Sequence, residues 1–196
     1  MTEKQEFLRK YKVRKYNLVE FLEFVDDRDG RYELIDGRIY MMASPNVVHQ
    51  EIVGDIGRKL KNYLDDKKCR VFIAPLDVVL FEKGKDKDKS QNVFQPDIFV
   101  VCDPKKIAKD KIYGAPDMVI EIVSFSSAIH DYRKKFEIYM KYGVKEYWIV
   151  NPETKQIFVK INGHGEHDEV IKYSFGDKIK ISIFDDFYLD FKELQI

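Results

Sequence analysis

Apolar and polar positions along the chain follow two different periods. Apolar residues recur every three to four positions in three segments, residues 18–25, 46–64 and 129–142, which predicts helices there. Short apolar or alternating runs are typical of strands, and they cover residues 31–35, 38–42, 70–74, 76–81, 95–101, 118–123, 145–150, 156–161, 170–175 and 178–184. Residues 82–92 are rich in Lys, Asp and Gly without apolar anchors, which predicts a mobile loop.

Short local motifs mark several ends of these segments. Asp36-Gly37 stands between two apolar runs and predicts a tight hairpin, because both turn positions favour positive φ. Asn17, followed three residues later by Glu20, is an N-cap pattern for the first helix. Ser44-Pro45 predicts the N-cap and first position of the second helix.

Two acids lie in strands that are otherwise apolar. Residues 118–123 form a continuous apolar run, typical of a strand covered on both faces, with Glu121 in its middle. Asp97 directly follows Pro96 and opens a second apolar strand. An ionised carboxylate in a dry strand must be paired, bind a metal or lose its charge. If the two strands are neighbours, about 4.8 Å apart, both carboxylates can meet at one divalent cation.

The composition limits the classes of function. The chain has 196 residues, which suits one domain with a sizeable core. Its 34 Lys and Arg residues balance 34 Asp and Glu residues, so any contact with nucleic acid requires a local patch. No apolar run reaches the length of a membrane span and the charged N-terminus lacks a signal-peptide pattern, so we expect a cytoplasmic protein with no membrane partner.

We divide the chain into a basic N-terminal extension, residues 1–16, and a single domain, residues 17–196. The excess of Lys and Arg in the extension favours either contact with a phosphate backbone or a solvated terminus. Cys69 and Cys102 each border an apolar run and lack the spacing of a zinc site, so we expect reduced, packed thiols. The aromatic content leaves surface for self-association, so a homodimer is a further expectation.

Several polar residues have simple structural explanations. Glu33 alternates with apolar neighbours and is expected to face water. His49 lies beside the apolar stripe of the second helix, where a packed or partly exposed histidine is the default and a catalytic or phosphate-contacting role is the alternative. Asp117 begins its strand and suits a capping role at the surface. His164 and His167 lie in a Gly-rich turn and are expected to be loop residues.

Two strand acids followed by a lysine match the needs of metal-dependent phosphodiester hydrolysis. Asp97 and Glu121 would hold Mg²⁺ or Mn²⁺, the cation lowers the pKa of a bound water, and an ammonium stabilises charge on the phosphorane. In the usual arrangement the lysine lies two residues after the second acid, where this chain has Val123. A lysine on the following helix can reach the same point. Lys135 is the best candidate, whereas Lys134 turns toward solvent.

Each of these residues also has a purely structural interpretation. Asp97 could bind backbone N–H groups at the strand entry, and Glu121 could form a buried salt bridge with Lys135. Lys135 shares one helical stripe with Asp131 and Tyr139, and pairing with Asp131 is its alternative.

A series of short motifs runs in a characteristic order from about residue 17 to the C-terminus. They are YELIDG at residues 32–37, Ser44-Pro45, His49, Pro96-Asp97, GAPD at residues 114–117 with Glu121, Ser124, Asp131, Lys135, Tyr139, Gly143-Val144 and EYW at residues 146–148. In order and spacing they resemble the Uma family of endonucleases, a branch of the restriction-endonuclease-like PD-(D/E)XK superfamily. Phe125 stands where that family usually has proline, which alters the turn after Glu121 without touching the acids.

The resemblance implies an α/β (α+β) fold, with a restriction-endonuclease-like core in which helices flank a central mixed β-sheet. It also implies a catalytic site of Asp97, Glu121 and the migrated Lys135, with Asp97 and Glu121 as metal ligands and Glu33 as a further acid.

The sequence therefore predicts a nuclease that depends on Mg²⁺ or Mn²⁺ and acts on nucleic acid, with DNA as the expected partner. The alternative is a catalytically silent nucleic-acid-binding or assembly module with a structural Glu–Lys ion pair. The neutral net charge and the missing strand lysine favour this alternative. A hydrolase for a different phosphate ester is a third interpretation.

Overall fold

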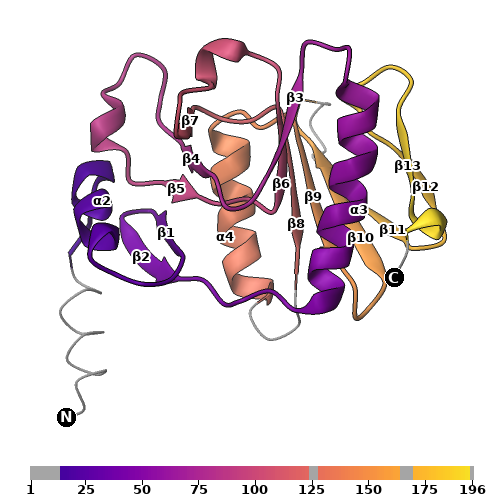
Figure 1. The fold of residues 1–196 in the computed structure, drawn as a ribbon, viewed down its shortest axis with the longest axis horizontal. Coiled ribbons are helices and arrows are strands. Elements are labelled where there is room, and N and C mark those ends of the chain that lie inside the picture. Colours follow the sequence, from indigo (N-terminus) through magenta and orange to yellow (C-terminus); the bar gives the residue numbers. More distant parts are fainter. Residues whose placement is uncertain (1–13, 124–127, 164–169, 195–196) are drawn as a thin grey trace.

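Three helices pack against two large β-sheets in the computed structural model, which describes residues 14–123, 128–163 and 170–194, with only the backbone of residues 128–133 (Figure 1). The helices are α2 (Leu18–Asp26), α3 (Val47–Leu64) and α4 (Ala128–Lys141), and short 3₁₀ turns are η1 (Lys87–Lys89), η2 (Pro104–Lys106) and η3 (Phe191–Glu193). Among the helices of the described residues, none has both the length and the apolar character needed to cross a membrane.

The larger sheet has six strands and lies between α3 and α4. Its order is β11 (Ile171–Ser174), β10 (Gln156–Ile161), β9 (Glu146–Asn151), β8 (Met118–Ile122), β6 (Ile98–Val101) and β3 (Arg70–Ile73). β8 and β9 run parallel and all other neighbours antiparallel, so the sheet is mixed.

Alternate residues of each central strand face opposite helices. Val100 of β6 belongs to the core cluster of α3, together with Ile56. Phe99, the preceding residue, belongs to the cluster that contains Tyr139 of α4. Burial on both faces explains why these strands are continuous apolar runs. The predicted fold class, a central mixed sheet flanked by helices, is confirmed.

The second sheet has five strands and carries the predicted hairpin. Its order is β2 (Arg38–Met41), β1 (Tyr32–Ile35), β5 (Val93–Phe94), β4 (Asp77–Val79) and β7 (Lys111–Tyr113). A separate pair, β12 (Lys178–Lys180) and β13 (Tyr188–Asp190), completes the structure. Asp36 and Gly37 connect β1 to β2 with φ of 52° and 76°, which confirms the predicted turn.

The start of the described chain is tied to this hairpin. Asn17 accepts a hydrogen bond from the backbone of Glu20, whose side chain accepts one from the backbone of Asn17, so the predicted N-cap is confirmed as a full capping box. Tyr16 is buried and its N–H donates to the Gly37 carbonyl at 2.8 Å, so this residue, assigned to the extension, packs against the domain.

One of two local predictions is wrong. Asn46, not Ser44, caps α3, because its Oδ1 accepts a hydrogen bond from the backbone N–H of His49 at 2.8 Å. The segment predicted to be a mobile loop is an exposed loop over residues 82–89, apart from the short turn η1, and it ends in buried residues. Ser90 donates from its hydroxyl to the Leu80 carbonyl at 2.6 Å, and this contact anchors the segment to the five-stranded sheet.

The two cysteines form a disulfide, so the prediction of reduced thiols is wrong. β3 and β6 pair with Arg70 opposite Val101, and Cys69 and Cys102 are the next opposed positions of this ladder. They are 33 residues apart in sequence. Because their pairing depends on strand register, no spacing motif predicts it.

Candidate active site

Asp97 and Glu121 meet at the ends of two adjacent strands. β6 and β8 run antiparallel with Ile98 opposite Ile120, so Asp97 and Glu121 are the next opposed positions. The backbone N–H of Asp97 donates to Glu121 Oε2 at 3.4 Å, and the backbone N–H of Ile122 donates to Asp97 Oδ2 at 2.9 Å. Each carboxylate thus accepts a hydrogen bond from the strand that carries the other.

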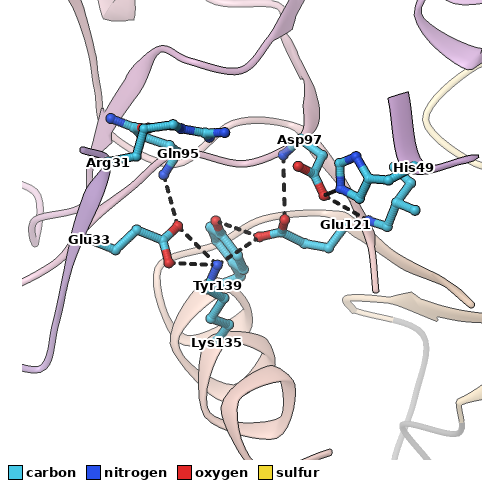
Figure 2. A network of polar contacts seen from close by, with 9 residues as sticks. Arg31, Glu33, His49, Gln95, Asp97, Glu121, Lys135 and Tyr139 are labelled. Carbon is cyan, nitrogen blue, oxygen red and sulfur yellow. Dashed lines mark hydrogen bonds and ion pairs between the residues drawn. The ribbon is translucent and has the colours of Figure 1, made fainter. Parts of the chain in front are cut away.

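Both acids line one cavity of about 300 Å³ (Figure 2). Its wall is built from β1, the segment that joins β2 to α3, and the strand ends, with α4 beneath. The histidine and the charged residues of this wall are Arg31, Glu33, His49, Asp97, Glu121 and Lys135. Except for Arg31 and His49, these residues are at most 8% exposed, so their charges interact with little screening by water.

Lys135 reaches the acids from α4. Its Nζ lies 2.7 Å from Glu33 Oε2 and 3.4 Å from Glu121 Oε1. Lys134, the neighbouring residue, pairs instead with Asp36 at 3.6 Å and has a side chain that is 38% exposed. Lys135 of α4 therefore lies beside Glu121, as the sequence led us to expect, although it comes from a helix and not from the strand that carries the acid.

Glu33 is buried, so the expectation that it faces water is wrong. Only 3% of it is exposed, and Oε1 accepts hydrogen bonds from the Gln95 backbone N–H at 3.0 Å and from Lys135 Nζ at 2.9 Å. The cause is the place of β1, which lies between β2 and β5 and is therefore an interior strand. Leu34 packs in the core cluster that contains residues of α2. Because successive side chains of a strand point to opposite faces, Glu33 points toward the cavity.

His49 contacts the strand acid from the first turn of α3. Its Nε2 lies 3.2 Å from Asp97 Oδ2. Among the described residues, the buried Nδ1 of His49 has no hydrogen-bond partner. The sequence left this residue between a packed and a functional role, because the contact joins positions 48 apart.

Burial and neighbouring carboxylates raise the pKa of Glu121. Burial, together with the nearby carboxylates of Asp97 and Glu33, raises the pKa of Glu121 to about 8, against the opposing effect of the Lys135 ammonium. Tyr139 donates its hydroxyl to Glu121 Oε1 at 3.4 Å, and burial first, then the Glu121 charge, raises the pKa of this phenol.

The donor set fits a divalent cation held by two carboxylates. Mg²⁺ typically takes one or two protein carboxylates and keeps several waters. Within the described residues, no group of three or more His, Cys, Asp or Glu side chains is placed to hold a metal ion. The cavity wall contains three carboxylates against two permanent cations, Arg31 and Lys135. A cation between Asp97 and Glu121 would offset the repulsion that raises the Glu121 pKa.

Among the described residues that line the cavity, Asp117 is absent. Asp117 is buried rather than at the surface; its carboxylate accepts from the Cys102 backbone N–H at 2.7 Å and pairs with Lys145 at 2.7 Å. The side chain of Asp131 lies outside the described residues, as do Ser124, Phe125, His164 and His167. The sequence did not single out Arg31, although it directly precedes the strand that carries Glu33.

Comparisons with known proteins agree with this architecture. A model of the Uma2 family, described as "Putative restriction endonuclease", matches residues 18–192. The uncharacterized protein slr1290 of Synechocystis is 23% identical over 166 residues, which cover 83% of this chain and 82% of that protein. The Synechocystis protein sll1609 is 23% identical over 122 residues, 61% of this chain and 65% of that protein.

A solved structure has the same fold. It is a "putative nuclease belonging to DUF820" from Anabaena variabilis, with a TM-score of 0.73 and 21% identity over 91% of this chain and 96% of that one.

Proposed function

Because the chain belongs to the Uma2 family, we propose that it is a metal-dependent nuclease that hydrolyses phosphodiester bonds of DNA. The observation that carries the proposal is the meeting of Asp97 and Glu121 in one cavity, with Lys135 within 3.4 Å of Glu121. Two carboxylates and an ammonium in a buried cavity suit the hydrolysis of an anionic ester.

Asp97 and Glu121 would hold Mg²⁺ or Mn²⁺. When bound, such a cation lowers the pKa of water and offsets negative charge on the phosphate. His49 contacts Asp97 and fixes the orientation of this carboxylate. Residues that hydrogen-bond to a metal ligand commonly orient it in this way.

Lys135 would stabilise the negative charge that develops on the phosphate oxygens. The residue is 8% exposed, and a charge in such a site acts more strongly than in water. Glu33 holds Nζ through both of its oxygens, at 2.7 and 2.9 Å, so its role is to position the lysine. Tyr139, one helical turn further, orients Glu121.

The same ion pairs favour a second candidate function. A buried lysine enclosed by Glu33 and Glu121 also satisfies both acids without catalysis. In that case the protein is a catalytically silent nucleic-acid-binding or assembly module.

Cleavage of supercoiled plasmid DNA tests the proposed activity. The purified chain should nick or cut the plasmid with Mg²⁺ or Mn²⁺, and a chelator should stop the reaction. Asp97→Ala and Glu121→Gln should each abolish cleavage while the circular dichroism spectrum stays that of the parent. Asp110→Ala is the matched control, because this acid is exposed and, among the described residues, forms its ion pair with the adjacent Lys111. Cleavage that persists in both site variants would assign the activity elsewhere.

Calorimetric titration with Mn²⁺ separates the two candidates. A nuclease should bind the ion, and the binding should be lost in Asp97→Ala and in Glu121→Gln. An ion pair closed by Lys135 should show no binding that depends on both acids.

A further inference from the structure

Arg31 places a guanidinium on the cavity wall, and no carboxylate of the described residues pairs with it. It directly precedes β1, and its backbone is fixed by a hydrogen bond from the Met42 N–H to its carbonyl at 2.8 Å. Its Nε donates to Gln95 Oε1 at 2.9 Å. Within the described part of the chain, its buried Nη2 has no hydrogen-bond partner and no ion pair includes this residue.

Gln95 holds the guanidinium in place. Its side-chain nitrogen donates to Asp77 Oδ1 at 2.9 Å, which fixes the amide so that Oε1 faces Arg31. Its backbone N–H donates to Glu33 at 3.0 Å. Gln95 also lies two residues before Asp97, so one short segment carries the strand acid and holds the guanidinium beside the same cavity (Figure 2).

The two permanent cations of the wall differ in what their charges contact. The Lys135 ammonium is enclosed by Glu33 and Glu121. Arg31 makes its side-chain contact with a neutral amide, so no carboxylate in the described part of the chain neutralises its charge. A guanidinium carries five N–H donors in a planar fork that matches two oxygens of a phosphate, and an unpaired buried donor is costly.

We infer that Arg31, held by Gln95, is a binding site for a phosphodiester group of the nucleic-acid backbone. The inference rests on the proposed nuclease function for the identity of the ligand. Arg31 would bind the substrate independently of the cation, through contacts that carry no base sequence. It is a binding residue, distinct in role from the acids and from Lys135.

Binding of a short fluorescein-labelled DNA duplex to metal-free protein, followed by fluorescence anisotropy, tests this site. Arg31→Gln should weaken binding about tenfold or more, because it removes hydrogen bonds from a charged donor. It should also reduce the slope of log affinity against log salt by about 0.9, the contribution of one phosphate contact. Two duplexes of unrelated sequence should lose affinity equally.

Arg38→Gln is the matched control, because Arg38 is an exposed arginine on the other strand of the same hairpin. It should leave both affinity and salt slope unchanged. Arg31→Lys keeps the charge without the fork, so it should restore the salt slope and only part of the affinity. Thermal denaturation establishes that each variant is folded.

The site is refuted if the parent does not bind DNA, if Arg31→Gln binds as tightly as the parent, if Arg38→Gln loses as much, or if the loss depends on sequence. A parent that binds through Arg31 but cuts no DNA with Mg²⁺ or Mn²⁺ would refute the nuclease and keep the phosphate site. A parent that cuts DNA while Arg31→Gln binds and cuts normally would keep the nuclease and refute the phosphate site.

Discussion

The stability of the metal-free protein should fall as pH rises, and Glu121→Gln should remove most of that fall. The pKa of Glu121 is about 8 in the folded protein against 4.5 for the free group. Between these values the folded state keeps a proton that the unfolded state releases. A group that binds more protons when folded loses stabilising effect as pH rises, so this contribution is complete below the lower pKa and lost as pH approaches the upper one.

The size of the effect follows from linkage. One full proton of difference corresponds to about 1.4 kcal/mol per pH unit, the largest slope that this group alone can give. In a chain of this length, 1 kcal/mol shifts the melting temperature by about 2 to 4 °C. Relative to Glu121→Gln, the parent should therefore lose about 3 to 6 °C per pH unit in the steepest part of the range.

Glutamine suits the comparison because it is nearly isosteric and can still accept from Lys135 and Tyr139 through its oxygen. Melting temperatures of both proteins would be measured with a chelator from about pH 5 to about pH 8, where groups common to both cancel. Mn²⁺ should then restore stability to the parent most strongly at the alkaline end, because the ion binds the deprotonated acid. Parallel curves for the two proteins would mean that Glu121 is ionised throughout and paired with Lys135.

Other substitutions separate the roles of neighbouring groups. Lys135→Met should lower the single-turnover rate of DNA cleavage by about 100-fold or more, whereas Lys134→Met, the solvent-facing neighbour, should leave it unchanged. Glu33→Gln should lower the free energy of unfolding in urea by about 3 kcal/mol, because it leaves a buried ammonium without its nearest countercharge; an unchanged urea midpoint would contradict the pairing. Trp148→Phe should cost about 1 to 3 kcal/mol in the same assay because Nε1 donates at 2.7 Å to the buried Glu146, and adding Glu146→Gln should recover part of that loss.

Local chemistry made several elements predictable from the sequence. Asn17 and Glu20 form a capping box within four residues of each other, and Asp36-Gly37 adopts the backbone that only such residues accept readily. The apolar runs around Asp97 and Glu121 indicated two buried strands, and their neighbouring positions in the sheet follow the hypothesis made from the sequence.

Contacts between distant segments were not predictable in the same way. The alternation around Glu33 is equally typical of an edge strand, and only the sheet order places this residue inside. Arg31 depends on Gln95, 64 residues away, and Cys69 reaches its partner only through strand register. Asn46 and Ser44 are both good caps, and the choice between them depends on which side chain reaches the first turn.

Because Lys135 lies on α4, its position in the cavity depends on the aromatic residues against which this helix packs. When an acid and a lysine lie two residues apart on one strand, covalent geometry limits the distance between their Cα atoms to about 7 Å. Here the distance between Lys135 and Glu121 depends on the position of α4. Tyr139 fixes this position, because its ring centroid lies 4.9 Å from that of Phe94 and 5.3 Å from that of Tyr147. Replacing Phe94 by a smaller residue would thus shift the ammonium relative to its acids without altering any polar group, so the geometry of the proposed active site can be adjusted from within the apolar interior.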